Sequence, residues 1–140
     1  MRVYLSQSEP EDGSPEHFTN IATFSRGVMD SEATNIICDR FLSSFPYDKI
    51  ETVLGLVLQK MRIGCELTVM EPDLRLISKN VFQDNMEEKL INEIVFKSGN
   101  LKSILTMETI EKWVSPKLEI TSKHFDAGLC VAVVKARRTQ

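Results

Sequence analysis

The sequence lacks the features that mark several common classes of protein. No apolar run approaches the roughly 20 residues that a membrane-spanning helix needs. The amino-terminal segment MRVYLSQSEPEDG has no apolar signal core, so we expect a cytoplasmic protein. Lys and Arg number 17 against 20 Asp and Glu, giving a net charge of −3. Binding to nucleic acid is not favoured, because it depends on many cationic contacts to phosphate.

Patterns of metal binding and of disulfide pairing are also missing. The two histidines, His17 and His124, have no Cys, Asp or Glu at the spacing of metal ligands, so we predict no metal site. The three cysteines, Cys38, Cys65 and Cys130, are odd in number, widely spaced and surrounded by apolar residues. They are therefore expected to be buried, reduced thiols.

The longest regular pattern predicts an amphipathic helix over residues 48–62. Asp48 followed by Glu51 has the pattern of a capping box, and Gly64 suits the position that ends a helix. The opposite face of the segment is polar. The apolar positions recur at the spacing of one helical face: Ile50, Val53, Leu54, Val57, Leu58 and Met61.

A buried strand and an acidic turn are predicted to follow this helix. Residues 67–70 form a short apolar run, and Glu71-Pro72-Asp73 ends it because proline cannot donate to a sheet. Ligand sites of open α/β sheets lie at the carboxyl ends of strands. This turn is therefore a candidate site, although two solvated carboxylates in a strand-ending loop would give the same sequence.

The remaining patterns predict a single domain of 140 residues with strands and helices interleaved. A largely parallel α/β sheet follows, with helices in layers on both sides and a carboxyl-terminal antiparallel hairpin. Further helices are expected after Asp73, one ending at Ser98-Gly99-Asn100 and a shorter one capped by Thr106. The predicted strands, besides 67–70, are Arg2–Ser6, Asn20–Phe24, Asn35–Asp39, Leu118–Phe125 and Leu129–Arg137.

A family resemblance rests on several short motifs. They are IICD at 36–39 with Phe41-Leu42, LQKMRIG at 58–64, LTV at 67–69, Asp73-Leu74, and a final strand 131–137 that ends KARR. Over residues 35–138 the chain resembles class I S-adenosylmethionine-dependent methyltransferases. It is most similar to the small methyltransferase-like proteins carried by tailed phages, including phages of cyanobacteria. The resemblance implies a Rossmann-like methyltransferase fold, with S-adenosylmethionine as the possible cofactor.

The resemblance also indicates where a cofactor would lie, and where the chain departs from the family. The implied cofactor-binding positions are Ser6, Asp39, Glu71 and Asp73, although Asp39 could equally cap the turn that follows it. The family's glycine-rich turn after the first strand, which lets backbone approach a ligand closely, is here SQSEPEDG at 6–13. The helix normally found between the first two strands is short or absent.

These departures predict a degenerate, non-catalytic domain without a bound cofactor. Such a domain would act as a protein-interaction or assembly module, with a protein partner or as a homo-oligomer, and the resemblance implies that a phage encodes it. The alternative is a minimal methyltransferase that binds S-adenosylmethionine and acts on an unknown acceptor.

Overall fold

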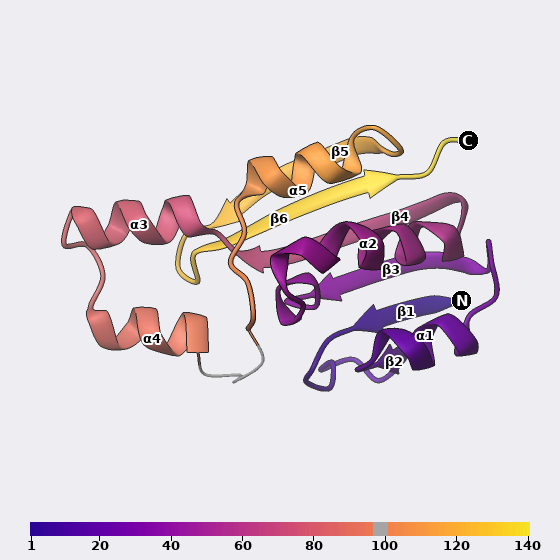
Figure 1. The fold of residues 1–140 in the computed structure, drawn as a ribbon, viewed down its shortest axis with the longest axis horizontal. Helices are drawn as coiled ribbons and strands as arrows, with labels where there is room; N and C mark the ends of the chain where they lie inside the picture. The colour runs from indigo at the N-terminus through magenta and orange to yellow at the C-terminus, as the bar shows by residue number, and fades with distance from the viewer. Residues whose placement is uncertain (97–100) are drawn as a thin grey trace.

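The computed structural model describes residues 1–96 and 101–140, and its strands form one six-stranded sheet in the order β2-β1-β3-β4-β6-β5 (Figure 1). The strands are β1 (Arg2–Leu5), β2 (Glu16–Phe18), β3 (Ala33–Asp39), β4 (Met61–Pro72), β5 (Glu119–Asp126) and β6 (Val131–Arg137). The helices are α1 (Ile21–Gly27), α2 (Ile50–Lys60), α3 (Leu74–Phe82), α4 (Glu88–Phe96) and α5 (Met107–Val114), with 3₁₀ turns η1 (Leu42–Ser44) and η2 (Tyr47–Lys49).

The sheet confirms the predicted fold class. Strands β1, β2, β3 and β4 pair in parallel, whereas β6 pairs antiparallel to both β4 and β5. The predicted hairpin of residues 118–137 is the β5–β6 pair, in which Asp126 lies opposite Val131. Only β6 runs against the other strands, so the sheet is mostly parallel.

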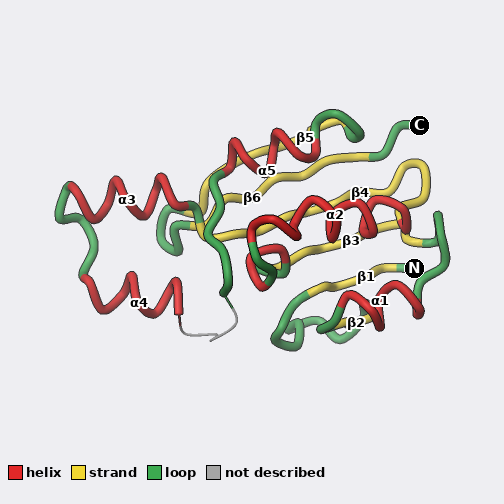
Figure 2. Tube along the Cα trace, in the orientation of Figure 1, coloured by secondary structure: helices red, strands yellow, loops and turns green. Residues whose placement is uncertain are grey.

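Three helices cover one face of this sheet, and the prediction of helical layers on both sides is wrong. Helices α1, α2 and α5 lie in front of the strands (Figures 1 and 2). Their buried side chains belong to a single core that includes alternate strand residues such as Leu5, Ile36, Leu67 and Val134. Helices α3 and α4 lie beyond the carboxyl ends of the strands, where Ile77 and Ile94 pack on Cys130.

The opposite face of the sheet carries no helix among the described residues. Its side chains come from the other strand positions, including Tyr4, Ile37 and Met70, which are half-buried and lie outside the core. At the edge of this face, Arg2 Nη1 donates to Ser14 Oγ of the loop that follows β1 at 3.1 Å. The helix-covered face of the sheet is therefore buried, and the opposite face is partly exposed to solvent.

Helix α2 confirms the predicted amphipathic helix but not its ends. Ile50, Val53, Leu54 and Val57 are buried as predicted. The capping box is not formed, since η2 precedes the helix and Lys49, not Asp48, is the cap residue. The helix ends at Lys60, and β4 begins at once because Met61 pairs with Ala33 of the neighbouring strand. Gly64 has a positive φ of 87°, but inside this strand, where its N–H donates to Arg138 O at 2.7 Å.

The second predicted strand is wrong. Residues 21–27 form α1, which begins at Asn20, whose Oδ1 accepts from Ala22 N at 2.7 Å. The edge strand is instead β2, at residues 16–18, where no strand was predicted. Three residues are too few to show a period of two, whereas Ile21, Phe24 and Val28 have the spacing of one helical face.

The last helix was predicted correctly, and one predicted helix end falls outside the description. Thr106 caps α5, because its Oγ accepts from Thr109 N at 3.3 Å. The predicted stop at Ser98-Gly99-Asn100 lies outside the described residues. In the part of the chain that the structure describes, no helix has the length and apolar character to cross a membrane.

Candidate functional site

The four predicted site residues lie where β1, β3 and β4 end. Ser6 directly follows β1, Asp39 is the last residue of β3, and Glu71 and Asp73 flank Pro72 at the end of β4. These strands are parallel neighbours, so their carboxyl ends share one edge of the sheet. This edge is where α/β sheets bind ligands.

Strand alternation nevertheless divides the four residues between the two faces. Asp39 bonds to Tyr4 and Ser6 contacts His17, and these partners lie on the helix-free face. Glu71 and Asp73 instead bond to η1 and to the starts of α3 and α5, on the helical side. Successive strand residues point to opposite faces, so one ligand surface does not gather all four.

The turn after β1 is closed by its own hydrogen bonds. Ser6 is 1% exposed, its Oγ donates to the carbonyl of Ser8, and the same Oγ lies 3.2 Å from His17 Nε2. Gly13 is the one glycine of the loop, and a Cβ built on it would have no atom within 4 Å. The missing side chain of Gly13 therefore makes room for no neighbouring atom of the protein. The connection from β1 to β2 contains no helix, and the helix that starts beside this turn is α1, where Gln7 Nε2 donates to Thr19 O at 3.0 Å.

Asp39 is half-buried and forms a short hydrogen bond with Tyr4. Tyr4 Oη donates to Asp39 Oδ2 at 2.5 Å across strands β1 and β3. Burial, together with this carboxylate, raises the pKa of the Tyr4 hydroxyl above its ordinary value. The alternative role of Asp39 as a cap is not seen, because η1 begins after Phe41 and has no side-chain cap.

Glu71 is fully buried beneath the segment that follows β3. Its Oε1 accepts from Ser43 N at 3.2 Å, and its Oε2 has no hydrogen-bond partner among the described residues. Burial raises the pKa of Glu71 from 4.5 to about 7, although hydrogen bonds from Ser43 and Leu42 oppose the rise. The Glu71 carboxyl is therefore a buried structural group that keeps its proton until the pH approaches neutrality.

This pKa predicts a dependence of stability on pH. The unfolded chain loses the Glu71 proton near pH 4.5 and the folded chain near pH 7, so unfolding becomes easier as pH rises between these values. The free energy of unfolding should fall by up to ~3 kcal/mol across this window. Urea unfolding at pH 5, 6, 7 and 8 measures it.

A matched pair of variants isolates the contribution of this side chain. Glu71→Gln should flatten the fall in stability, since glutamine has no proton to lose in this range. Glu51→Gln removes an exposed carboxyl from α2 and should leave the fall unchanged. An equal pH dependence in the natural chain and in Glu71→Gln would show that Glu71 is ionised in the folded protein.

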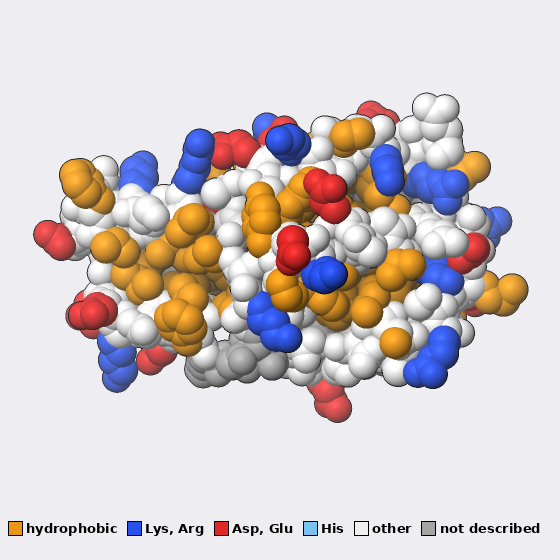
Figure 3. Space-filling model, in the orientation of Figure 1, with side chains coloured by type: hydrophobic (Ala, Val, Ile, Leu, Met, Phe, Trp, Pro, Cys, Tyr) orange, Lys and Arg blue, Asp and Glu red, His pale blue; other side chains and the backbone are white. Residues whose placement is uncertain are grey.

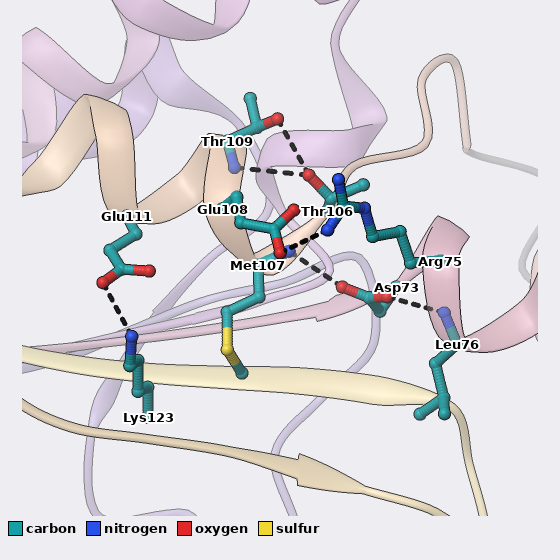
Figure 4. Close-up of polar contacts among 9 residues, drawn as sticks. All are labelled: Asp73, Arg75, Leu76, Thr106, Met107, Glu108, Thr109, Glu111 and Lys123. Carbon is teal, nitrogen blue, oxygen red and sulfur yellow. Dashed lines mark hydrogen bonds and ion pairs between the residues drawn. The ribbon is translucent and has the colours of Figure 1, made fainter.

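Asp73 holds together the starts of two helices (Figure 4). It is 1% exposed, its Oδ1 accepts from Leu76 N at 2.8 Å, and its Oδ2 accepts from Met107 N at 2.8 Å. The same close-up shows exposed ion pairs, Arg75 with Glu108 and Lys123 with Glu111, near these helices. Both carboxylate oxygens of Asp73 are thus used within the protein.

A hollow of about 280 Å³ near the end of β1 is lined by other residues than the four predicted ones. The described residues contain no group of three or more His, Cys, Asp or Glu side chains that could hold a metal ion. The lining residues of the hollow are Gln7, Thr19, Asn20, Ile21, Ser44, Phe45 and Lys102.

Sequence reasoning missed Tyr4 and Ser43. The alternation of residues 2–6 places Tyr4 opposite the core, but only the register of β1 against β3 brings it to Asp39, 35 positions away. Ser43 reaches Glu71 through a backbone N–H, which every residue except proline carries. No local signal distinguishes it.

Comparison with known proteins finds the fold in solved structures only. No protein-family model matches the chain, and no curated protein matches its sequence. A SAM-dependent methyltransferase from Archaeoglobus fulgidus has 10% sequence identity and a TM-score of 0.60, over 97% of this chain and 75% of that one.

Two further structures carry bound S-adenosylhomocysteine. The 1,6-didemethyltoxoflavin-N1-methyltransferase of Burkholderia thailandensis is 12% identical, with a TM-score of 0.61 over 99% of this chain and 61% of its own. The magnesium protoporphyrin IX methyltransferase of Synechocystis PCC 6803 is 11% identical, with a TM-score of 0.56 over 89% and 51%. This chain thus spans less than two thirds of either enzyme. At these identities the likeness establishes that the chain has the Rossmann-like fold of SAM-dependent methyltransferases.

Proposed function

We propose that the chain is a methyltransferase-like domain that does not bind S-adenosylmethionine tightly and acts as a protein-interaction or assembly module. The observation that carries the proposal is the closed turn after β1. There Ser6 Oγ donates to the carbonyl of Ser8, and a Cβ built on Gly13, the single glycine of the loop, would meet no atom within 4 Å.

The state of the other site residues supports the same proposal. Glu71 is buried within the protein, and both carboxylate oxygens of Asp73 accept hydrogen bonds from backbone N–H groups. Binding a nucleoside in this fold needs a carboxylate for the ribose hydroxyls, in addition to a close backbone approach. Asp39 is the predicted residue that keeps partial exposure, and Tyr4 already occupies one of its oxygens.

The proposal also covers the origin of the protein and its location in the cell. The resemblance to phage-borne methyltransferase-like proteins favours a phage origin. A cytoplasmic location agrees with three cysteines that are buried and free in the structure, because such thiols stay reduced there.

Calorimetry with S-adenosylmethionine and S-adenosylhomocysteine tests the proposal. We expect no binding with a dissociation constant below about 1 mM, which corresponds to only ~4 kcal/mol. The Synechocystis enzyme, whose structure contains bound S-adenosylhomocysteine, is the positive control in the same buffer. A micromolar constant for this chain would overturn the proposal.

The second candidate function is a minimal methyltransferase, and Asp39 is the observation in its favour. Its carboxylate is half-buried at the carboxyl end of β3, at the sheet edge where ligands bind in this fold class. If the natural chain bound the cofactor and Asp39→Asn did not, the enzyme would be the correct interpretation. Tyr4→Phe is the matched control, because it removes the hydrogen bond to Asp39 but keeps the carboxylate.

A further inference from the structure

Helices α3 and α4 expose an unusual amount of apolar surface. Phe82 is 90% exposed and Phe96 is 65% exposed. Apolar side chains gather over the region of these two helices in the space-filling view (Figure 3). Contiguous exposed apolar patches on a protein commonly mark interaction sites. The exposed apolar residues of the two helices are Leu74, Val81, Phe82, Leu90 and Phe96.

The two helices have little packing of their own to hold them. Each is 9 residues long, which is below the length at which isolated helices are stable in water. Their inner side buries Ile77 and Ile94 against Cys130, a much smaller cluster than the main core. They extend beyond the end of the sheet and run antiparallel to one another (Figure 1). A second apolar contact on the outer side would stabilise them.

The charges on the two helices are complementary. Helix α3 carries Arg75 and Lys79 and no acidic residue, whereas α4 carries Glu88 and Glu93 against one Lys89. A surface with one basic and one acidic helix is complementary to a second copy of itself, when a two-fold axis brings α3 of each copy to α4 of the other. Complementary charges also guide such an association and fix its register.

Spacing on the two helices matches as well. Lys79 and Phe82 lie three positions apart on α3, and Leu90 and Glu93 lie three positions apart on α4. Because α3 and α4 are antiparallel within one copy, the two-fold axis that brings α3 to α4 of the partner also makes these two helices antiparallel. When Lys79 meets Glu93 of the partner subunit, Phe82 then lies opposite Leu90 of the partner subunit, which is 40% exposed.

We propose that the chain forms a two-fold symmetric dimer through α3 and α4, with Phe82 of each copy against Leu90 of the partner subunit. This proposal rests on the proposed function, since it names the partner of the interaction module as a second copy. The apolar area exposed on the two helices amounts to roughly 1,000 Å² over two copies, about the lower limit for a specific interface. The dimer should therefore dissociate at micromolar rather than nanomolar concentrations.

Sedimentation velocity over a range of micromolar concentrations tests the dimer. We expect the natural chain to shift from its 15.9 kDa mass toward twice that value as concentration rises. Phe82→Glu should raise the dissociation constant at least ~30-fold, because it places a charge in the apolar centre of the contact. Phe82 is 90% exposed within one copy, so this variant should keep the melting temperature of the monomer.

Two further sets of variants test which surface forms the contact and which residues of the two copies lie opposite each other in it. Ile63→Glu alters an exposed apolar residue of β4 and should leave the dimer intact. Lys79→Glu should weaken the dimer, and adding Glu93→Lys should restore it. A natural chain that stays monomeric, a dimer that survives Phe82→Glu, or a double variant as weak as the single one would overturn the proposal. Because none of these measurements involves the cofactor, they fail or succeed independently of the calorimetry.

Discussion

Replacing Val57 by aspartate should leave no folded protein. Val57 is fully buried in α2 and belongs to the core between this helix and the sheet. The change removes roughly 1.5–3 kcal/mol of apolar burial and adds the larger cost of an unpaired buried charge. Domains of this size are stable by only about 5–15 kcal/mol. Circular dichroism and amide spectra should show a chain without cooperative unfolding.

A matched substitution on the exposed side of the same helix provides the control. Thr52→Asp introduces the same side chain near the start of α2, where Thr52 is exposed and a negative charge suits the helix dipole. This variant should unfold at or above the temperature of the natural chain. A folded Val57→Asp protein with an unchanged melting temperature would contradict the orientation of α2 on the sheet.

Removing the carboxylate of Asp73 should lower the free energy of unfolding by about 2–4 kcal/mol. Asp73→Ala deletes the cap of α3 and leaves the buried Met107 N–H without an acceptor. Asp73→Asn should have an intermediate effect, because an amide offers one acceptor oxygen where the carboxylate offers two. Urea unfolding of the three proteins measures the differences.

Thr106 caps one helix only, so its removal provides the comparison for the loss of Asp73. Thr106→Ala removes the cap of α5, and this loss should cost about 1 kcal/mol. The excess cost of Asp73→Ala reports the bond that joins the two helix starts (Figure 4). Equal costs for Asp73→Ala and Thr106→Ala would show that the bond to Met107 contributes nothing.

Sequence patterns predicted the elements whose signals are local and long. Helix α2 has three turns of regular apolar spacing, the β5–β6 hairpin alternates on both sides of a glycine-containing link, and Thr106 stands directly before α5. Helix α1 was predicted to be a strand, and strand β2 was not predicted. Helix α1 has seven residues and β2 has three, and so few residues carry too little periodicity to distinguish a helix from a strand.

The candidate site was predicted by location but not by geometry. Asp39 ends β3 as predicted, whereas β4 continues through Glu71 and Pro72, beyond the predicted strand 67–70. The carboxyl ends of both strands still place Asp39, Glu71 and Asp73 at one sheet edge. Their partners could not be predicted, because the bond from Met107 to Asp73 spans 34 positions and depends on how α5 returns to the sheet. Which face each carboxylate takes depends on where in a strand the alternation begins, and a short apolar run leaves this undecided.

The helix-free face of the sheet has a consequence for how this sequence can change over time. Along β3 and β4, one residue in two faces the core and must keep its volume, whereas its neighbours, such as Asn35 and Ile37, meet partial solvent. Substitutions at the second set leave the packed side untouched. New surface chemistry can therefore accumulate at the half-exposed positions on one side of the sheet while the fold is preserved by the other, and related chains can diverge at those positions without losing the architecture.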